Sequence, residues 1–123
     1  MARVDYDFLY DGVRHLLTIG YNVTDRRHGH HVAERRRDAS YYDLLASEAR
    51  LASFVAIAQG QLPQQSWFAL GRLLTNAGSG ATLLSWSGSM FEYLMPLLVM
   101  PTYEDTLIGD SCRTAVRWQI DYG

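Results

Sequence analysis

The sequence predicts an all-α fold that begins with a short β-hairpin. Apolar residues recur at helical spacing in three segments, 38–58, 63–74 and 110–122. Strands and helices do not alternate in the βαβ order that a parallel sheet requires. With 123 residues, 48% of them hydrophobic and 20% charged, the chain is expected to form one globular domain.

The hairpin is predicted over residues 8–21, where β-prone residues flank Asp11-Gly12, a dipeptide typical of tight hairpin turns. A polar loop, 22–37, follows it. Three hypotheses compete for this loop. The histidines His28, His30 and His31 could bind a metal only with a further ligand, and the arginines could bind phosphate or nucleic acid, although no aromatic platform is interleaved with them. A solvated connection is the favoured interpretation.

The helix predicted over 38–58 carries Glu48 in the middle of its apolar stripe. Ser40 and Asp43 resemble a capping box, and Asp38 suits the positive end of the helix dipole. A carboxylate on a buried face is costly unless it is paired. Glu48 is therefore either part of an internal network or a chemically active group.

The C-terminal half contains a second unusual carboxylate. A helix over 63–74 is followed by a glycine-rich loop, 76–81, which lacks the pattern of a phosphate-binding loop. From residue 83 to 103 the only charged residue is Glu92, and Pro96 should end its helix at about residue 95. The last helix, 110–122, has Asp110 or Ser111 as its predicted cap.

Two carboxylates among apolar, aromatic and serine residues are typical of enzymes that cleave carbohydrates, in which one carboxyl donates a proton and the other stays ionised. Burial should raise the pKa of Glu92 unless a cation or several hydrogen-bond donors contact it. Structural roles remain open for both residues. Glu48 could pair with Arg50, with Arg113 or with a helix N-terminus, and Glu92 could anchor the backbone of the Ser-Gly turn.

Asp43 and the three tryptophans could have either a structural role or a role in binding sugar. From the residues alone, Asp43 is favoured as a helix-start residue, and Trp67 and Trp118 are favoured as core side chains. Trp86, beside the Ser-Gly-Ser turn, is the better platform for a sugar ring.

Composition and charge exclude several function classes. The formal net charge is −2, so no overall basic surface for nucleic acid is expected, although all 11 basic residues are arginine. Cys112 is the single cysteine and cannot form an internal disulfide, which favours a reducing compartment. The longest apolar run is too short to cross a bilayer, and no signal peptide opens the chain, so the segment itself is expected to be soluble.

Four strings closely resemble the glycoamylase-like segment of bacterial cyclic β-1,2-glucan synthases, in the same order and from about residue 8 to 123. They are YYDLLASEARLASFVAIAQG (41–60), WFALGRLLT (67–75), LLSWSGSMFEYLMPLLVM (83–100) and CRTAVRWQIDYG (112–123). The resemblance implies part of an (α/α)6 barrel that closes linear β-1,2-glucan into a ring by retaining transglycosylation, as in a glycoside hydrolase.

The resemblance also implies a cellular context. The parent would be a very large protein of the bacterial inner membrane, and this segment would lie on the cytoplasmic face. The segment itself would need no cofactor or metal, whereas another domain would use UDP-glucose. Its partners would be the β-1,2-glucan chain, the remaining half of the barrel and the other domains of the parent, with no nucleic acid and no direct membrane insertion.

Carried over by position, the resemblance assigns Glu48 and Glu92 as the catalytic carboxylates. The residues that it implies would contact the glucan are Asp38, Tyr42, Asp43, Trp86, Ser87 and Tyr93.

Two departures from the family stand out. The stretch 24–37 is longer than the family's usual connection, and the family continues past residue 123 into a segment with a further glutamate. We therefore expect a fragment that is inactive alone and marginally stable. The alternatives are a non-catalytic carbohydrate-binding helical module and part of a stand-alone β-1,2-glucanase.

Overall fold

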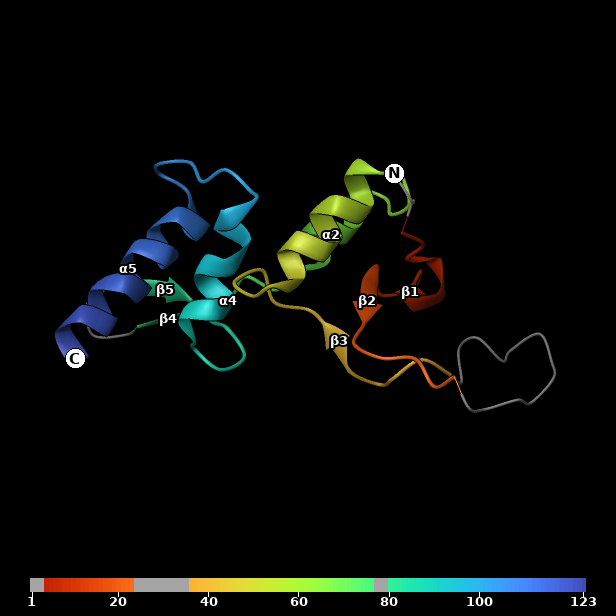
Figure 1. Ribbon diagram of the computed structural model, residues 1–123, viewed down its shortest axis with the longest axis horizontal. Helices are drawn as coiled ribbons and strands as arrows, with labels where there is room; N and C mark the ends of the chain where they lie inside the picture. Colours follow the sequence, from red (N-terminus) through yellow and green to blue (C-terminus); the bar gives the residue numbers. More distant parts are fainter. Residues whose placement is uncertain (1–3, 24–35, 77–79) are drawn as a thin grey trace. The chain divides into compact units, whose positions relative to one another are not determined.

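The computed structural model describes residues 4–23, 36–76 and 80–123 (Figure 1). The chain divides into two compact units, which are described separately. The N-terminal unit comprises Met1–Asp43 and Ser53–Leu70, and the C-terminal unit comprises Leu44–Ala52 and Gly71–Gly123. The hypothesised metal ligands of the polar loop, His28, His30 and His31, lie outside the described residues, as do residues 77–79 of the glycine-rich loop.

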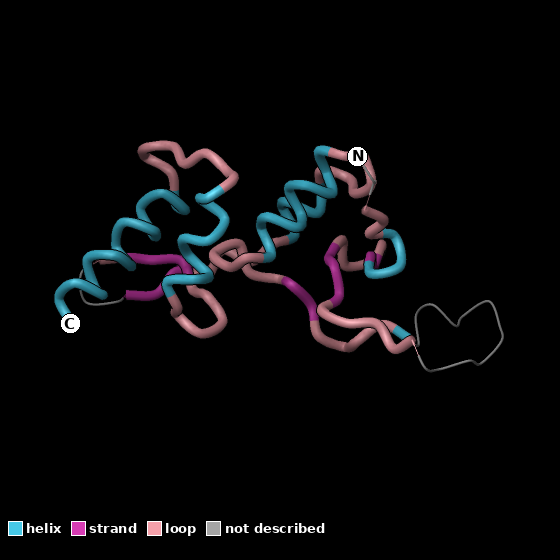
Figure 2. The backbone as a smooth tube through the Cα atoms, in the orientation of Figure 1, coloured by secondary structure: helices cyan, strands magenta, loops and turns pink. Residues whose placement is uncertain are grey.

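The N-terminal unit contains a three-stranded antiparallel sheet, coloured magenta in Figure 2. A 3-10 helix, η1 (Asp7–Leu9), precedes the sheet, whose strands are β1 (Tyr10–Asp11), β2 (Leu16–Thr18) and β3 (Tyr41–Tyr42), in the order β1-β2-β3. The β1–β2 pair lies where the Asp-Gly dipeptide predicts a hairpin. The unit also includes α3 (Gln65–Ala69) and the second part of α2 (Ala49–Ala58), and it buries Leu17, Ala56, Leu62 and Leu70.

The C-terminal unit packs one long helix against a two-stranded sheet. The strands β4 (Leu74–Asn76) and β5 (Ala81–Leu83) pair antiparallel, and α4 (Met90–Leu94) continues into the 3-10 helix η2 (Met95–Leu98). The helix α5 (Leu107–Tyr122) runs beside β5 and contacts α4 (Figure 1). Leu83, Tyr93, Cys112 and Ala115 are buried where these elements meet.

The predicted all-α fold, and with it the barrel implied by the resemblance, is wrong. The described residues form four α-helices and two antiparallel sheets. The helix predicted over 63–74 ends at Ala69, because Leu70 is extended (φ −62°, ψ 126°) and almost fully buried. The chain then enters β4, in which Leu74 and Thr75 pair with Leu83 and Thr82. Helical spacing of leucines did not reveal this pairing across the glycine-rich loop.

The helix predicted over 38–58 begins only at Ala49. Its expected first residues, Tyr41 and Tyr42, instead pair with Thr18 and Leu17 of β2. The predicted capping box does not form, and Asp38 Oδ1 accepts a hydrogen bond from the Ser40 amide at 2.8 Å. Aromatic side chains favour strands when a partner strand is present, and the hairpin supplies that partner.

The ends of two other helices can be compared with the predictions. The α4 helix ends at Leu94, directly before Met95 and Pro96, so the predicted stop is confirmed. The α5 helix begins three residues earlier than predicted, because the side chain of Thr106 accepts a hydrogen bond from the Gly109 amide at 3.1 Å. Within the three described ranges, no helix combines the length and the apolar character needed to span a bilayer.

Candidate functional site

The Glu92 carboxylate lies at the start of α4, inside a turn of three serines. Ser89 caps the helix and Glu92 is the third helical residue, so the two form a reciprocal capping box. The amide of Ser87 donates to both carboxylate oxygens at 3.2 and 3.0 Å, and the Ser89 amide donates at 3.1 Å. The hydroxyls of Ser85, Ser87 and Ser89 also donate to Oε2. We call residues 85–92 the serine turn.

These donors determine the ionisation of Glu92, which is 5% exposed. Burial raises the pKa of this carboxyl, but the hydrogen bonds from Ser87 and Ser89 together outweigh burial and leave the pKa below its ordinary value of 4.5. The sequence predicted a raised pKa for Glu92 unless several hydrogen-bond donors contact it. Several donors do contact it, so this exception applies. Glu92 is ionised near neutral pH and is unsuited to act as a proton donor there.

Two other predicted residues, Trp86 in the serine turn and Tyr93 directly after it, differ in exposure. Trp86 is 63% exposed. Gly88 has a φ of +71°, a left-handed conformation that glycine adopts without strain and that lets the turn close on the carboxylate. Tyr93 is 5% exposed, and its hydroxyl donates to the Leu83 carbonyl at 2.6 Å. Tyr93 therefore joins α4 to β5.

Glu48 lies immediately before α2 and has a contrasting environment. Its Oε2 atom is buried and accepts no hydrogen bond from the described residues. The adjacent Ser47 hydroxyl accepts a hydrogen bond from the Ala49 amide at 3.2 Å, and the Glu48 carbonyl accepts one from the Leu51 amide at 3.0 Å, which together fix the start of the helix. The backbone of Glu48 is thus held while one carboxylate oxygen has no partner.

Arg50 connects the segment that carries Glu48 to the helix that carries Glu92. The guanidinium is buried, with 2% exposure, and donates to the carbonyls of Ser47 at 3.0 Å, of Glu92 at 3.0 Å, and of Tyr93. Burial lowers the pKa of Arg50, and the nearby Cys112 and Glu48 oppose this shift. Arg50 forms no ion pair with Glu48 in the described part of the chain, so the alternative in which these two side chains pair is not observed.

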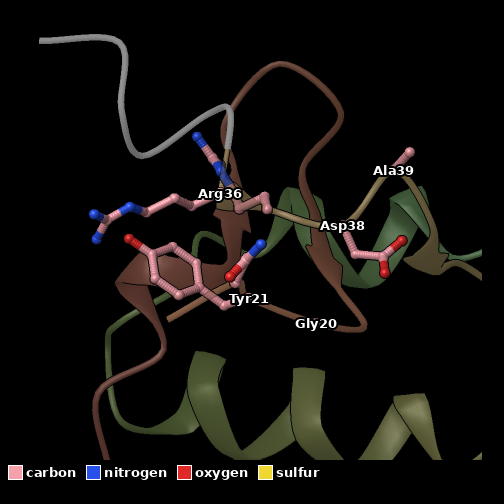
Figure 3. Close-up of a pocket in the computed structure, with 7 residues that line it drawn as sticks. Gly20, Tyr21, Arg36, Asp38 and Ala39 are labelled. Atoms are coloured by element: carbon pink, nitrogen blue, oxygen red, sulfur yellow. The ribbon is translucent and has the colours of Figure 1, made fainter. Parts of the chain in front are cut away.

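The remaining predicted residues, Asp38, Tyr42 and Asp43, belong to the N-terminal unit. Tyr42 lies on β3 opposite Leu17. The Oδ1 atom of Asp43 is buried and has no hydrogen-bond partner in the described structure. Asp38 lines a pocket of about 440 Å³, shown in Figure 3. The residues lining this pocket are Gly20, Tyr21, Asn22, Arg36, Arg37, Asp38 and Ala39.

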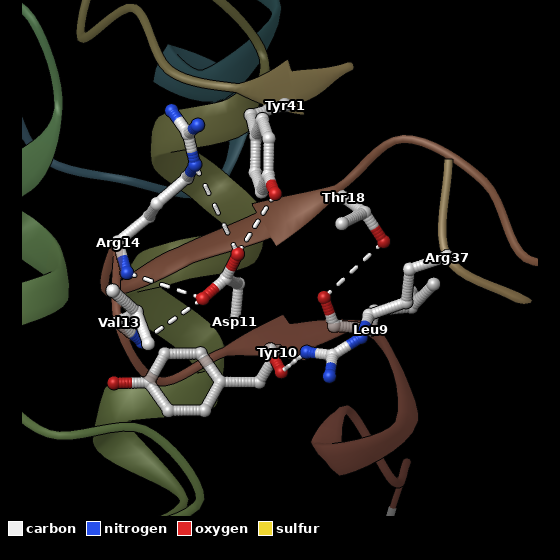
Figure 4. Close-up of polar contacts among 8 residues, drawn as sticks. All are labelled: Leu9, Tyr10, Asp11, Val13, Arg14, Thr18, Arg37 and Tyr41. Atoms are coloured by element: carbon white, nitrogen blue, oxygen red, sulfur yellow. Dashed lines mark hydrogen bonds and ion pairs between the residues drawn. The ribbon is translucent and has the colours of Figure 1, made fainter. Parts of the chain in front are cut away.

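The N-terminal unit also contains a polar network that the sequence did not predict (Figure 4). Asp11 accepts hydrogen bonds from the Tyr41 hydroxyl at 2.7 Å and from the amides of Val13 and Arg14. The Tyr41 hydrogen bond is the main reason that the pKa of Asp11 lies below its ordinary value, with burial opposing it. The Arg14 guanidinium lies 4.9 Å from the centre of the Tyr41 ring. This network joins the hairpin turn to β3.

A second cavity lies in the C-terminal unit and includes Trp118, which the sequence analysis favoured as a core residue. Trp118 is 48% exposed. The cavity has a volume of about 280 Å³ and is lined in part by Ser85, Ser87 and Tyr93. In the sequence, only the position of Trp118 near the end of the predicted amphipathic helix indicated that its side chain could be exposed. Among the described residues, no three His, Cys, Asp or Glu side chains lie close enough together to hold a metal ion.

Comparison with known proteins supports the resemblance found in the sequence. No protein-family model matches the chain. Over 120 residues, which are 98% of the chain, it is 44% identical to the cyclic β-(1,2)-glucan synthase NdvB of Rhizobium meliloti (strain 1021). The chain is similar to a short segment of this synthase. It spans only 4% of the synthase's length, and the predicted resemblance is confirmed as partial.

Most of the predicted site residues lie in the same unit of the structure. Five of the eight predicted residues, Glu48, Trp86, Ser87, Glu92 and Tyr93, lie in the C-terminal unit. Arg50 links the backbones of the segments that carry Glu48 and Glu92. The part of the chain that resembles the synthase thus contains one carboxylate saturated with donors and one with an unpaired oxygen.

Proposed function

We propose that the chain is a segment of the glucan-cyclising part of a cyclic β-1,2-glucan synthase. The observation that carries this proposal is the 44% identity to such a synthase over nearly the whole chain. In this proposal the segment acts on a β-1,2-glucan chain and works together with the rest of a larger inner-membrane protein, at its cytoplasmic face. Another part of that protein uses UDP-glucose, and the isolated segment is inactive.

The proposed reaction is retaining transglycosylation, as in glycoside hydrolases that use two carboxyl groups. A carboxylate attacks the anomeric carbon and forms a glycosyl ester, while the departing sugar oxygen takes a proton from the second carboxyl group. A 2-hydroxyl at the other end of the same glucan then attacks the ester, gives its proton back to the second group and closes the ring. No net oxidation or hydrolysis takes place.

Glu48 and Glu92 are the proposed carboxylates, in different roles. Glu48 is the proposed second carboxyl group, which gives its proton to the departing oxygen and takes it back, because its buried Oε2 has no hydrogen bond to give up before it reacts. Glu92 is ionised and held in place by its donors, so it is the proposed carboxylate that attacks the anomeric carbon and balances the positive charge developing there. Arg50 holds the backbones of both segments together.

The test is performed in a full-length synthase that contains this segment. Glu48→Gln should lower the rate of cyclic glucan formation by at least about 100-fold, the typical loss when a catalytic acid or base is removed. Linear glucan should accumulate, and mass spectrometry of the products distinguishes the two forms. The matched control is Glu104→Gln, which alters an exposed glutamate of the same unit and should leave product formation unchanged. Cyclic product at the normal rate in the Glu48 variant would refute the catalytic role.

The second candidate is a non-catalytic glucan-binding module. The full set of donors on Glu92 favours it, because such saturation is what an anchor of the turn requires. Under this alternative, Glu48→Gln leaves ring closure intact in the synthase. The two functions therefore give opposite results in the same assay.

A further inference from the structure

Arg50 is a buried cation that hydrogen-bonds only to uncharged acceptors. The guanidinium, which is 2% exposed, donates to the carbonyls of Ser47 and Glu92 at 3.0 Å each, and to that of Tyr93. Within the described ranges, no carboxylate lies at ion-pair distance from Arg50. Burial of such a charge costs free energy. Its presence therefore needs a reason beyond hydrogen bonds to the backbone.

Two side chains that can carry a negative charge influence Arg50. Burial lowers the pKa of Arg50, and the charges of Cys112 and Glu48 act against this shift, so both lie within electrostatic range of the guanidinium. The Cys112 thiol donates to the Tyr93 carbonyl at 3.2 Å, and burial raises the pKa of this thiol although Arg50 opposes the rise. Cys112 is thus a neutral thiol near neutral pH. Glu48 is left as the group whose charge Arg50 can balance.

The proposed reaction creates a negative charge on Glu48. Its carboxyl group gives a proton to the departing sugar oxygen, the bond between that oxygen and the anomeric carbon breaks, and Glu48 is left as a carboxylate. The buried Oε2 atom accepts no hydrogen bond from the described residues. A buried carboxylate without donors is strongly disfavoured, so the proton leaves at a large cost unless a nearby cation offsets the new charge.

We propose that Arg50 is a positioning residue that acts through Glu48: its fixed positive charge stabilises the carboxylate that forms when Glu48 donates its proton. This inference rests on the proposed function. The three carbonyls hold the guanidinium in place before the reaction, so the charge needs no rearrangement when the proton leaves. When Glu48 takes a proton from the attacking 2-hydroxyl, the starting state returns.

The first experiment compares two substrates of a full-length synthase that contains this segment. Linear β-1,2-glucan has a poor leaving group and needs the proton, whereas the 2,4-dinitrophenyl glycoside of a β-1,2-glucan chain releases an anion that needs none. Arg50→Met removes the charge at similar volume. It should lower cyclic glucan formation at least about 10-fold and the initial burst of dinitrophenolate by less than about 3-fold.

Glu48→Gln should show the same selective loss, because it removes the proton donor itself. An equal loss with both substrates in Arg50→Met would mean that Arg50 only supports the fold, and it would overturn the inference. Cyclic glucan formation at the normal rate in this variant would also overturn it. Arg117→Gln, which alters an exposed arginine of the same unit, is the control and should affect neither substrate.

A double variant tests whether Arg50 acts through Glu48. Adding Arg50→Met to Glu48→Gln should lower ring closure by less than about 2-fold beyond Glu48→Gln alone, because the carboxylate that the cation stabilises no longer forms. A further loss as large as that of the single Arg50 variant would show independent action and refute the inference. Arg50→Lys keeps the charge and should stay within about 3-fold of the original rate.

The two proposals fail in different ways. Normal ring closure in Glu48→Gln refutes the catalytic role of Glu48 and, with it, the role of Arg50. Loss of ring closure in Glu48→Gln together with normal ring closure in Arg50→Met refutes the role of Arg50 alone.

Discussion

The serine turn and the segment 47–50 each contain a glutamate of the C-terminal unit, but the two carboxylates accept very different numbers of hydrogen bonds. At Glu92, backbone amides and serine hydroxyls donate to the carboxylate from several directions. At Glu48, the neighbouring hydrogen bonds involve Ser47 and the backbone, and Oε2 receives none. Both glutamates have buried carboxylate atoms, but only Glu92 is surrounded by donors, so burial alone does not determine the environment of a carboxylate.

The largest difference between the two segments should appear in stability. Glu92→Ala removes the acceptor for two amides and three hydroxyls and breaks the capping box, and we expect a loss of about 3 kcal/mol in the free energy of unfolding. Urea titration followed by circular dichroism measures it. Glu104→Ala, at an exposed position, should change stability by less than about 0.5 kcal/mol. Similar losses in the two variants would contradict the anchoring role.

Removal of the link between the segments should have the next largest effect. Arg50→Met fills a similar volume but leaves the carbonyls of Ser47, Glu92 and Tyr93 without their donor, so we expect a loss of about 2 kcal/mol. Relief of the buried charge offsets part of the cost. Arg50→Lys should recover part of the loss, because an ammonium group can reach some of the same carbonyls. A variant as stable as the original chain would show that the link contributes nothing.

A pH titration should show a smaller effect that depends on Glu92. Its pKa in the folded chain lies below the ordinary value of 4.5. A lowered pKa adds stability that is complete above the unfolded value and is lost as pH falls through the folded value. The free energy of unfolding should therefore fall below about pH 4.5, and the difference between the original chain and Glu92→Gln should shrink there.

Asp11 provides the matched comparison, because its pKa is also lowered. Asp11→Asn should remove only the Asp11 share of the acid-induced loss and leave the share of Glu92. If Glu92→Gln shows the same pH dependence as the original chain, the serine turn does not favour the ionised carboxylate.

The smallest effect is expected at Glu48. Glu48→Gln keeps the shape of the side chain and breaks no hydrogen bond of the buried oxygen, so stability should change by no more than about 0.5 kcal/mol in either direction. The same urea titration measures this change. A loss as large as that of Glu92→Ala would mean that Glu48 also anchors the fold, and the contrast between the two segments would disappear.

The sequence predicted local features better than pairings between distant segments. Pro96 ended its helix as expected, and the alternative in which Glu92 anchors the Ser-Gly turn matches its hydrogen bonds. The strand at Tyr41 and Tyr42 was missed, because its partner lies in the N-terminal hairpin and helical spacing describes only neighbours along the chain.

The candidate site was predicted only in part for a related reason. The sequence marked Glu48 and Glu92 as unusual, since Glu48 falls in the middle of an apolar stripe and Glu92 is the only charge from residue 83 to 103. It could not show that hydroxyls and amides surround the carboxylate of Glu92, nor that one carboxylate oxygen of Glu48 has no hydrogen-bond partner in the described structure. Trp118 is a large aromatic residue of the kind usually buried in a core. Its exposure depends on how α5 packs against β5.

The guanidinium of Arg50 also imposes an order on biosynthesis. Its acceptors on Glu92 and Tyr93 lie 42 and 43 positions further along the chain. A ribosome that has just released Arg50 from its exit tunnel must translate another forty or so codons before those carbonyls emerge. Until then, water must solvate a cation that the finished protein shields, so the first turns of α2 cannot reach their final packing in the nascent polypeptide.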